Sequence, residues 1–247
     1  MWFLRVSLSV ASAAAVVCLI LGSVSYIRYI DRQQITYLEA STSYGERKEI
    51  RLPDGTQLIL NSCSRVCYPD RFADEERRVE LEGEGYFRVY HNEKQPFIVN
   101  TRHFDVRVLG TCFNVKSYSS DEVVSVDVVS GKVQVDLPEA MMRLRAKEQI
   151  LINTVSGEYN KRHEERAVAV WRRGSLRFNS TPIRDVAKEL ERMYNCRITF
   201  TQGQEFNNLI SGEHDNKSLE AVLQSIGYTS GIHYKRSGDQ VLLLSLI

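Results

Sequence analysis

The sequence lacks an excess of charge of either sign. Its 247 residues include 32 Lys and Arg against 31 Asp and Glu, which gives a formal net charge of +1. Basic side chains are interleaved with acidic ones, so no stretch sets up the field that a nucleic-acid partner requires. We therefore interpret the charged residues as solvated surface and expect no nucleic-acid partner.

Proline and glycine are also scarce. Five prolines and fourteen glycines, in a chain that is 43% hydrophobic and 26% charged, argue against a disordered chain. The composition is that of a globular protein. The roughly 215 residues that follow the apolar N-terminus are enough to form two modest cores.

Motifs for catalysis and for metal binding are missing too. The sequence has no Gly-x-Ser-x-Gly elbow and no glycine-rich phosphate loop ending in Lys-Ser or Lys-Thr. Glu82-Gly83-Glu84-Gly85 lacks the oxygen-ligand spacing of a calcium loop, and we interpret it as a polar turn before a strand. The histidines are isolated, without ligand-like spacing: they are His91, His103, His163, His214 and His233. The sequence thus predicts no catalytic, cofactor-binding or metal-binding residue, and a protein that is not an enzyme.

Cysteine usage leaves one alternative open. Cys63 and Cys67 are four residues apart, and neither a histidine nor a further cysteine pair completes a zinc site around them. In an oxidising compartment the two could form a local disulfide. In a reducing one they would be small buried thiols.

The one long apolar run lies at the N-terminus. Val6 to Ile27 contains no charged residue and is flanked by Arg5 and Arg28. At 1.5 Å per residue, such a helix crosses a hydrocarbon core of about 30 Å. We expect residues 6–27 to form a transmembrane helix. The alternative is a cleaved signal peptide with a cleavage site at Ser23-Val24-Ser25, which the length of the apolar run disfavours.

A different pattern marks the next region. After a polar connector over residues 28–43, apolar and polar side chains alternate, as Phe104, Val106 and Val108 do with their neighbours. Asp54-Gly55 between two apolar runs is a strong hairpin signal. Short strands at this spacing predict an all-β domain over residues 44–155, which could close as a sandwich, a roll or a solenoid.

A second, smaller domain is expected after a charged linker over residues 156–170. Thr181-Pro182 has the form of a helix N-cap followed by proline at the first helical position. Strand and helix patterns follow in the order β-α-β-β-α-β-β, which predicts an α+β domain over residues 171–247. Its final strand, Val241–Leu244, is apolar enough for an internal strand; left at an edge, it would pair with a strand of a partner.

Several segments together resemble the FecR family, in the form common in Bacteroidetes. No single segment is specific, but six of them occur in the right order. In the β-rich region they are Leu52-Pro53-Asp54-Gly55-Thr56 with Leu60-Asn61 and Ser64, Tyr68-Pro69 with Phe72, Arg78 to Phe87, Pro96 to Val99, Val108 to Val115, and Gly131-Lys132-Val133. Trp171, Gly174 to Phe178 and the helix after Pro182 resemble the C-terminal domain of that family, which is similar to the secretin-and-TonB short N-terminal fold.

The resemblance implies a regulator that crosses the inner membrane once and has its bulk in the periplasm. It is expected to sense the signalling domain of an outer-membrane TonB-dependent receptor and to pass the signal to an extracytoplasmic-function sigma factor by protein–protein contact, without a cofactor. Family members carry a cytoplasmic segment before the anchor, whereas only Met1 to Arg5 stand there in this sequence. We expect either a start upstream of Met1 or a chain that does not itself hold the sigma factor. The residues that contact either partner are not predicted.

Two other functions compete with this one. The first is a periplasmic binding or scaffold module, for glycan or envelope partners, without sigma-factor control. The second is an envelope enzyme whose site follows no recognised motif. An in-frame helical segment upstream of Met1, with a sigma-factor gene nearby, would favour the signal relay.

Overall fold

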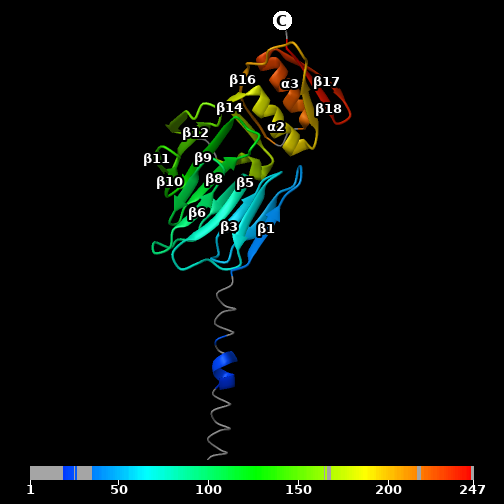
Figure 1. Ribbon diagram of the computed structural model, residues 1–247. Helices are drawn as coiled ribbons and strands as arrows, with labels where there is room; N and C mark the ends of the chain where they lie inside the picture. Colours follow the sequence, from blue (N-terminus) through cyan, green and yellow to red (C-terminus); the bar gives the residue numbers. More distant parts are fainter. Residues whose placement is uncertain are drawn as a thin grey trace, which may run out of the picture. The chain divides into compact units, whose positions relative to one another are not determined.

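The strands of the β-rich part are arranged around the long strand β5 (Figure 1). The computed structural model describes residues 19–24, 26, 35–163, 165, 168–215 and 218–245, and Tyr37–Ile247 form one compact unit. The β-rich part of this unit contains β1 (Tyr37–Ser41), β2 (Lys48–Arg51), β3 (Gln57–Leu60), β4 (Arg65–Pro69), β5 (Arg77–Arg88), β6 (Phe97–Asn100), β7 (Asp105–Val108), β8 (Cys112–Ser117), β9 (Val123–Ser130), β10 (Lys132–Asp136), β11 (Met141–Arg145), β12 (Glu148–Asn153) and β13 (Tyr159–His163).

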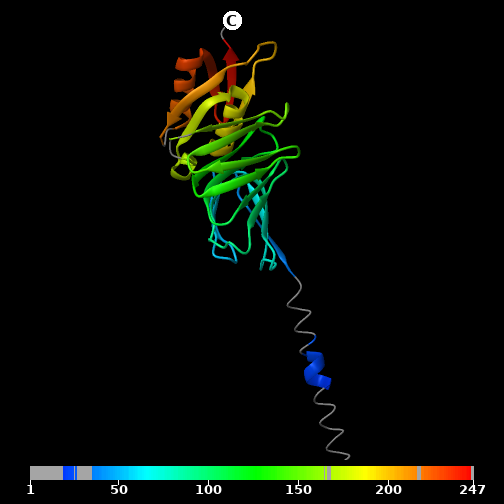
Figure 2. The same cartoon turned by 90° about the vertical axis from the view of Figure 1, so that its left-hand side faces the viewer.

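Strand β5 belongs to two layers. Its first half, Arg77 to Glu82, pairs with β4 and β6, whereas its second half, Gly83 to Arg88, pairs with β3 and β8. One layer continues through β6, β7, β10 and β11, and the other through β8, β9, β12 and β13. The layers enclose a core of Val, Leu, Ile and Phe side chains, and both views show them stacked (Figures 1 and 2). The β-rich part is thus a sandwich.

Gly83 lies where β5 passes from one layer to the other. Its φ is +104°, and a Cβ there would lie 2.7 Å from the Cα of Ser64. Glycine is required for two reasons, because other residues rarely adopt this φ and because the backbone of Ser64 occupies the space. Glu82–Gly85 is therefore the middle of a strand, and the predicted polar turn at this segment is wrong.

The Asp-Gly turn between β2 and β3 is present and is tied to β5. The carboxylate of Asp54 accepts hydrogen bonds from the backbone nitrogen of Thr56 at 3.0 Å and from its Oγ1 at 2.7 Å. It also forms a salt bridge with Nη1 of Arg77 at 2.7 Å, and only 1% of the Arg77 side chain is exposed. Arg77 donates further to the carbonyls of Tyr90 and Gln95. A guanidinium this deeply buried needs such a set of partners, so the turn fixes the start of β5 as well as the hairpin.

The C-terminal module follows the β-rich part. It consists of the 3-10 helix η1 (Val170–Arg173), β14 (Leu176–Pro182), α2 (Ile183–Tyr194), β15 (Arg197–Phe200), β16 (Leu209–His214), α3 (Leu219–Ser230), β17 (Ile232–Ser237) and β18 (Gln240–Ser245). From β14 onward, this order of strands and helices is the expected one. The module has its own apolar core, into which α2 and α3 each contribute one face. Oγ of Ser218 caps α3 by accepting a hydrogen bond from the backbone nitrogen of Ala221 at 3.3 Å.

Strand β18 occupies the centre of its sheet, not an edge. It pairs in parallel with β15 and antiparallel with β17, and Val241 is buried. Val241–Leu244 is therefore an internal strand, which is the first of the two alternatives that the sequence left open, and strand addition at it is excluded. Pairing with β15, a strand far away in the sequence, is what makes β18 internal. At the start of α2, Pro182 is the N-cap residue in place of the expected Thr181, whose Oγ1 accepts a hydrogen bond from the backbone nitrogen of Asn179 at 3.2 Å.

Strands also occur in segments that were expected to be irregular. β1 lies in the expected connector and pairs with β4, and β13 lies in the expected linker and pairs with β12. Four of the five residues of each strand are exposed. Hydropathy does not reveal strands of this kind, because neither face of an exposed edge strand needs to be apolar.

The transmembrane helix expected over residues 6–27 is not supported. Most of that segment lies outside the described residues, and its described part, residues 19–24 and 26, is helical. No helix among the described residues is long and apolar enough to cross a membrane. The prediction of a transmembrane helix is wrong on this finding, and so is the single-pass location in the inner membrane with the bulk in the periplasm. An uncharged run of sequence indicates hydropathy and does not by itself establish the length of a helix.

Candidate functional site at the junction of the two parts

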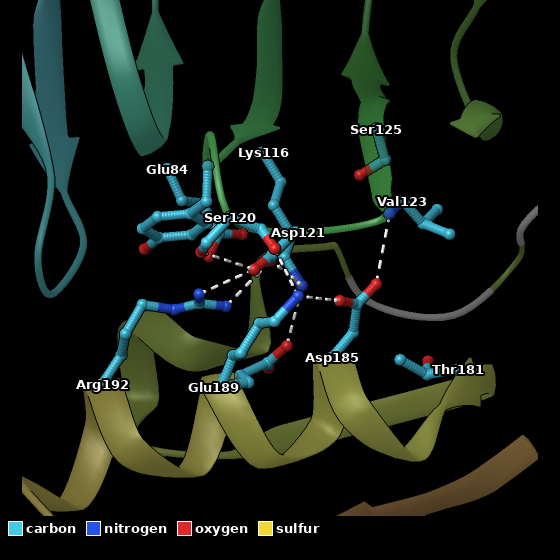
Figure 3. Close-up of polar contacts among 12 residues, drawn as sticks. Glu84, Lys116, Ser120, Asp121, Val123, Ser125, Thr181, Asp185, Glu189 and Arg192 are labelled. Carbon is cyan, nitrogen blue, oxygen red and sulfur yellow. Dashed lines mark hydrogen bonds and ion pairs between the residues drawn. The ribbon is translucent and has the colours of Figure 1, made fainter. Parts of the chain in front are cut away.

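Helix α2 has different chemistry on its two faces. Ile183, Val186 and Leu190 are buried in the core of the C-terminal module. The opposite face carries charged residues at helical spacing, which places them on one stripe: Asp185, Lys188, Glu189 and Arg192. This stripe faces the end of β8 and the loop that leads into β9 (Figure 3).

A bidentate ion pair joins Arg192 of α2 to Asp121 of that loop. The guanidinium donates from Nη1 to Oδ1 at 2.8 Å and from Nη2 to Oδ2 at 2.9 Å. The side chain of Asp121 is fully buried, and that of Arg192 is 10% exposed. The guanidinium also lies 3.8 Å from the ring centre of Tyr118, whose hydroxyl donates to the carbonyl of Ser62 at 2.8 Å. The pair is therefore held on the β-rich side by a ring that is itself fixed.

Lys116, near the end of β8, adds a second cation. Its Nζ lies 2.9 Å from Oε2 of Glu189 and 3.6 Å from Oδ2 of Asp121. Burial alone would lower the pKa of Lys116, but the carboxylates of Glu189 and Asp121 hold that pKa above its ordinary value. Burial alone would raise the pKa of Asp121, but Lys116 and Arg192 hold it below its ordinary value. Lys116 and Asp121 therefore both remain charged at neutral pH and attract each other in the folded protein.

Asp185, in the first turn of α2, binds the backbone of the same loop. Its Oδ1 accepts a hydrogen bond from the backbone nitrogen of Glu122 and its Oδ2 accepts one from that of Val123, both at 3.1 Å. Lys188, one helical turn later, donates from Nζ to Oδ1 of Asp185 at 3.0 Å and to the carbonyl of Ser120. The loop before β9 is thus fixed to α2 through its main chain as well as through Asp121 (Figure 3).

A second polar contact lies at η1. Nε1 of Trp171 donates to Oδ1 of Asn114 at 3.3 Å, and Nδ2 of Asn114 donates to Oε1 of Glu84 at 2.9 Å. The other carboxylate oxygen of Glu84 accepts a hydrogen bond from Nδ2 of Asn61 at 2.7 Å. Burial raises the pKa of Glu84, and Lys116 and the two amides oppose that effect. Trp171 of the module therefore supplies a hydrogen bond to Asn114, a buried polar residue of the β-rich part.

This arrangement is suited to fixing an orientation. An apolar contact tolerates sliding, whereas a bidentate charge pair and an aspartate that accepts from two consecutive amides are satisfied in one geometry. The carboxylates and cations of the junction are bonded to each other, which leaves them poorly placed for proton transfer. In the part of the chain that the structure describes, no group of three His, Cys, Asp or Glu side chains could hold a metal ion.

Comparison with known proteins identifies the family. A family model described as FecR protein matches residues 39–134, and one described as FecR, C-terminal, matches residues 175–243. The chain belongs to the FecR family. This is a regulatory, non-enzymatic family, and Asp121 lies in the first matched region whereas Arg192 lies in the second. No curated protein matches this FecR chain.

Two crystal structures of a candidate anti-sigma factor from Parabacteroides distasonis are similar to this FecR chain. One, at 2.50 Å resolution, is 46% identical with a TM-score of 0.84, and the match covers 86% of this chain and 100% of that chain. The other, at 1.65 Å resolution, is 47% identical with a TM-score of 0.83, and the match covers 85% and 100%. Coverage this high includes both the β-rich part and the C-terminal module, so the likeness extends across the junction.

Cys63, Cys67 and His214 have surroundings that are typical of structural residues. Cys63 and Cys67 are free thiols, so the local disulfide does not form in this structure. Burial raises the pKa of both thiols, which makes them weak nucleophiles. His214 is buried beside the ring of Phe178.

The charged stripe of α2 is what sequence reasoning missed. Its residues were interpreted as solvated surface, and for Asp185 and Arg192, which are 1% and 8% exposed, that interpretation is wrong. The only available signal is the helical spacing of the four charges. Exposed helices carry the same spacing, because such pairs also stabilise a solvated face.

Proposed function

We propose that this FecR chain relays a signal from the signalling domain of an outer-membrane TonB-dependent receptor to an extracytoplasmic-function sigma factor, by protein–protein contact. Membership of the family supports a role in sigma-factor regulation. The observation that carries the proposal is the buried junction. A relay requires that binding of a partner to one part changes the structure of the other part. The bidentate Arg192–Asp121 pair connects the two parts through residues that are 71 apart in the sequence.

For the receptor contact we propose the C-terminal module, at the outer edge of β17. This strand pairs only with β18 among the described strands and stands at the end of the three-stranded sheet. Its side chains from His233 to Ser237 are not buried. An unpaired edge of this kind accepts an extended segment of a partner through main-chain hydrogen bonds. The opposite edge, β15, is shorter and pairs with β18 in parallel.

A transcription assay tests the relay. A strain that lacks the gene would carry a reporter driven by the sigma factor and would be complemented with the wild-type chain, with Arg192→Met or with Arg184→Met. We expect receptor-dependent induction with the wild type and with Arg184→Met, because Arg184 is an exposed residue of the same helix. We expect induction to be lost or constitutive with Arg192→Met. A reporter that responds identically with and without the gene would contradict the proposal.

Hydrogen exchange of the full chain tests the contact surface. On addition of the receptor's signalling domain, we expect slowed exchange at every second amide of Ile232–Ser237, because strand addition would give new acceptors to the amides that point away from β18. Protection confined to Tyr37–His163 would move the receptor contact to the β-rich part and would contradict the proposal for β17.

A further inference from the structure

A cavity lined by polar and apolar side chains lies beside the junction, between the β-rich part and the C-terminal module. Its volume is about 360 Å³, which is within the range of sites for small ligands. One wall is the outer face of β8, β9, β12 and β13. The other wall comes from β14, from the start of α2 and from the residues around η1.

Strand alternation determines the chemistry of the first wall. Residues two apart on a strand face the same side, and neighbouring strands are about 4.8 Å apart, so polar side chains form a grid across the wall. The polar members of this grid are three amides, one hydroxyl, one carboxylate and one guanidinium, and Val123 and Leu151 of the same strands add apolar surface. The polar residues are Ser125, Asp127, Gln149, Asn153, Asn160 and Arg162. The opposite wall adds Asn179, Ser180 and Thr181. Several of these groups already bond to each other or to the backbone. Gln149 donates to Asp127 and accepts from Arg162, and Oδ1 of Asn153 accepts from two backbone amides. Each bonded side-chain amide keeps at least one further donor hydrogen for a ligand.

The charges around the cavity favour a ligand without charge. Burial raises the pKa of Glu84 and of Asp127, so these two lining acids do not count as full negative charges. The remaining lining charges balance, which favours neither an anion nor a cation: they are the carboxylates Glu158, Asp185 and Glu189 and the cations Lys116, Arg162 and Arg177. The carboxylates are also largely engaged, which disfavours a cation. Asp127 accepts hydrogen bonds from Ser125 and from the Gln149 amide, and Glu189 is paired with Lys116.

We propose that this cavity binds a neutral, hydroxyl-rich ligand, a short saccharide. A sugar has hydroxyls that donate and accept and carbon faces that pack on apolar side chains, which matches a wall of amides and hydroxyls with Val123 and Leu151 among them. Asn160 is exposed at this wall, and its side chain bonds to no other described residue. It therefore supplies a donor and an acceptor at the cavity. The proposal does not depend on the relay function.

Titration of the full chain with three neutral disaccharides tests the site. Chitobiose, cellobiose and maltose would each be added to about 10 mM, where a complex of millimolar Kd is well populated. The side-chain amide resonances of Asn and Gln would be followed by NMR. We expect a saturable shift of amides at the cavity with at least one of the three sugars.

Two matched variants locate the binding. Asn160→Trp places a large side chain at the wall and should weaken binding about tenfold or more, whereas Asn207→Trp changes an exposed asparagine away from the cavity and should leave it unchanged. Thermal unfolding of both variants would show that they fold. No saturable shift with any of the three sugars, or equal binding by Asn160→Trp, would overturn the assignment. Preferential binding of inorganic phosphate or of spermidine would overturn it as well, because the ligand would then be charged.

Discussion

Replacing Arg192 by methionine isolates the ion pair at the junction. Methionine keeps an unbranched chain of similar length, so the packing of the aliphatic part of the arginine against its surroundings is largely retained. The guanidinium is lost, and with it both hydrogen bonds to Asp121 and the contact with the Tyr118 ring. The remaining carboxylate of Asp121 is fully buried.

The cost can be worked from the surroundings of Asp121. Removing one partner of a buried ion pair costs about 3–5 kcal/mol, because the other charge is left buried without compensation. Lys116 still lies 3.6 Å from Oδ2 of Asp121 and retains part of the attraction. We therefore expect Arg192→Met to lose about 3 kcal/mol of unfolding free energy. Combining it with Asp121→Asn removes the uncompensated charge, so the double variant should recover about half of that loss.

Urea unfolding of the full chain measures these values, and Arg184→Met is the control. Arg184 is exposed on the same helix, where its guanidinium stacks on Phe200 at 4.8 Å from the ring centre, and its loss should cost under about 1 kcal/mol. A transition of Arg192→Met that splits into two would show that the two parts unfold separately once the pair is broken. The reasoning is refuted if Arg192→Met costs no more than Arg184→Met, or if the double variant is less stable than both single ones.

Two further predictions concern the β-rich part. Burial raises the pKa of Asp127 from 3.8 to about 7. The folded protein therefore holds this proton more tightly than the unfolded chain does, which adds to the free energy of unfolding. This contribution, up to about 4 kcal/mol, is complete below about pH 4 and is lost as the pH rises to about 7. Asp127→Asn mimics the neutral form and should reduce this pH dependence, measured as urea midpoints at several pH values across that window; a wild-type pH profile in the variant would contradict the assignment. Gly83→Ala should cost about 2 kcal/mol more than Gly55→Ala in urea unfolding, because both glycines have positive φ, whereas only at Gly83 would the new Cβ meet the backbone of Ser64. Equal losses at the two positions would mean that β5 can shift away from Ser64.

The β-rich part could be predicted from the sequence because its signals are local. Phe104, Val106 and Val108 alternate with polar residues and are all buried, as period 2 requires. Asp54-Gly55 makes the expected turn. What the turn binds was not predictable, because the partner of Asp54 is a fully buried arginine 23 residues later, and nothing in the composition around Arg77 distinguishes it from a surface arginine.

The junction and the last sheet could not be predicted because their contacts are distant in sequence. Asp121 belongs to a loop after β8 and Arg192 to the last turn of α2, and each taken alone has the appearance of a solvated charge. The central position of β18 depends on parallel pairing with β15, which the order of elements does not specify. At the N-terminus, the run of uncharged residues predicted a membrane-spanning helix, whereas no helix among the described residues is long and apolar enough to span a membrane.

The geometry of the junction sets a condition on any signal that passes through it. A partner shifts an equilibrium between two arrangements only if it binds one of them better. A partner that bound the C-terminal module without displacing α2 would leave the Arg192–Asp121 pair and the contacts of Asp185 unchanged. A displacement of α2 by about 1 Å would instead stretch two charge-assisted hydrogen bonds beyond their usual length. It would also pull on the backbone of Glu122 and Val123, which Asp185 holds at the entry to β9. If the proposed relay passes from the module to the sandwich at this junction, it requires movement of α2, and variants that weaken the charged stripe should alter transmission more than they alter partner binding.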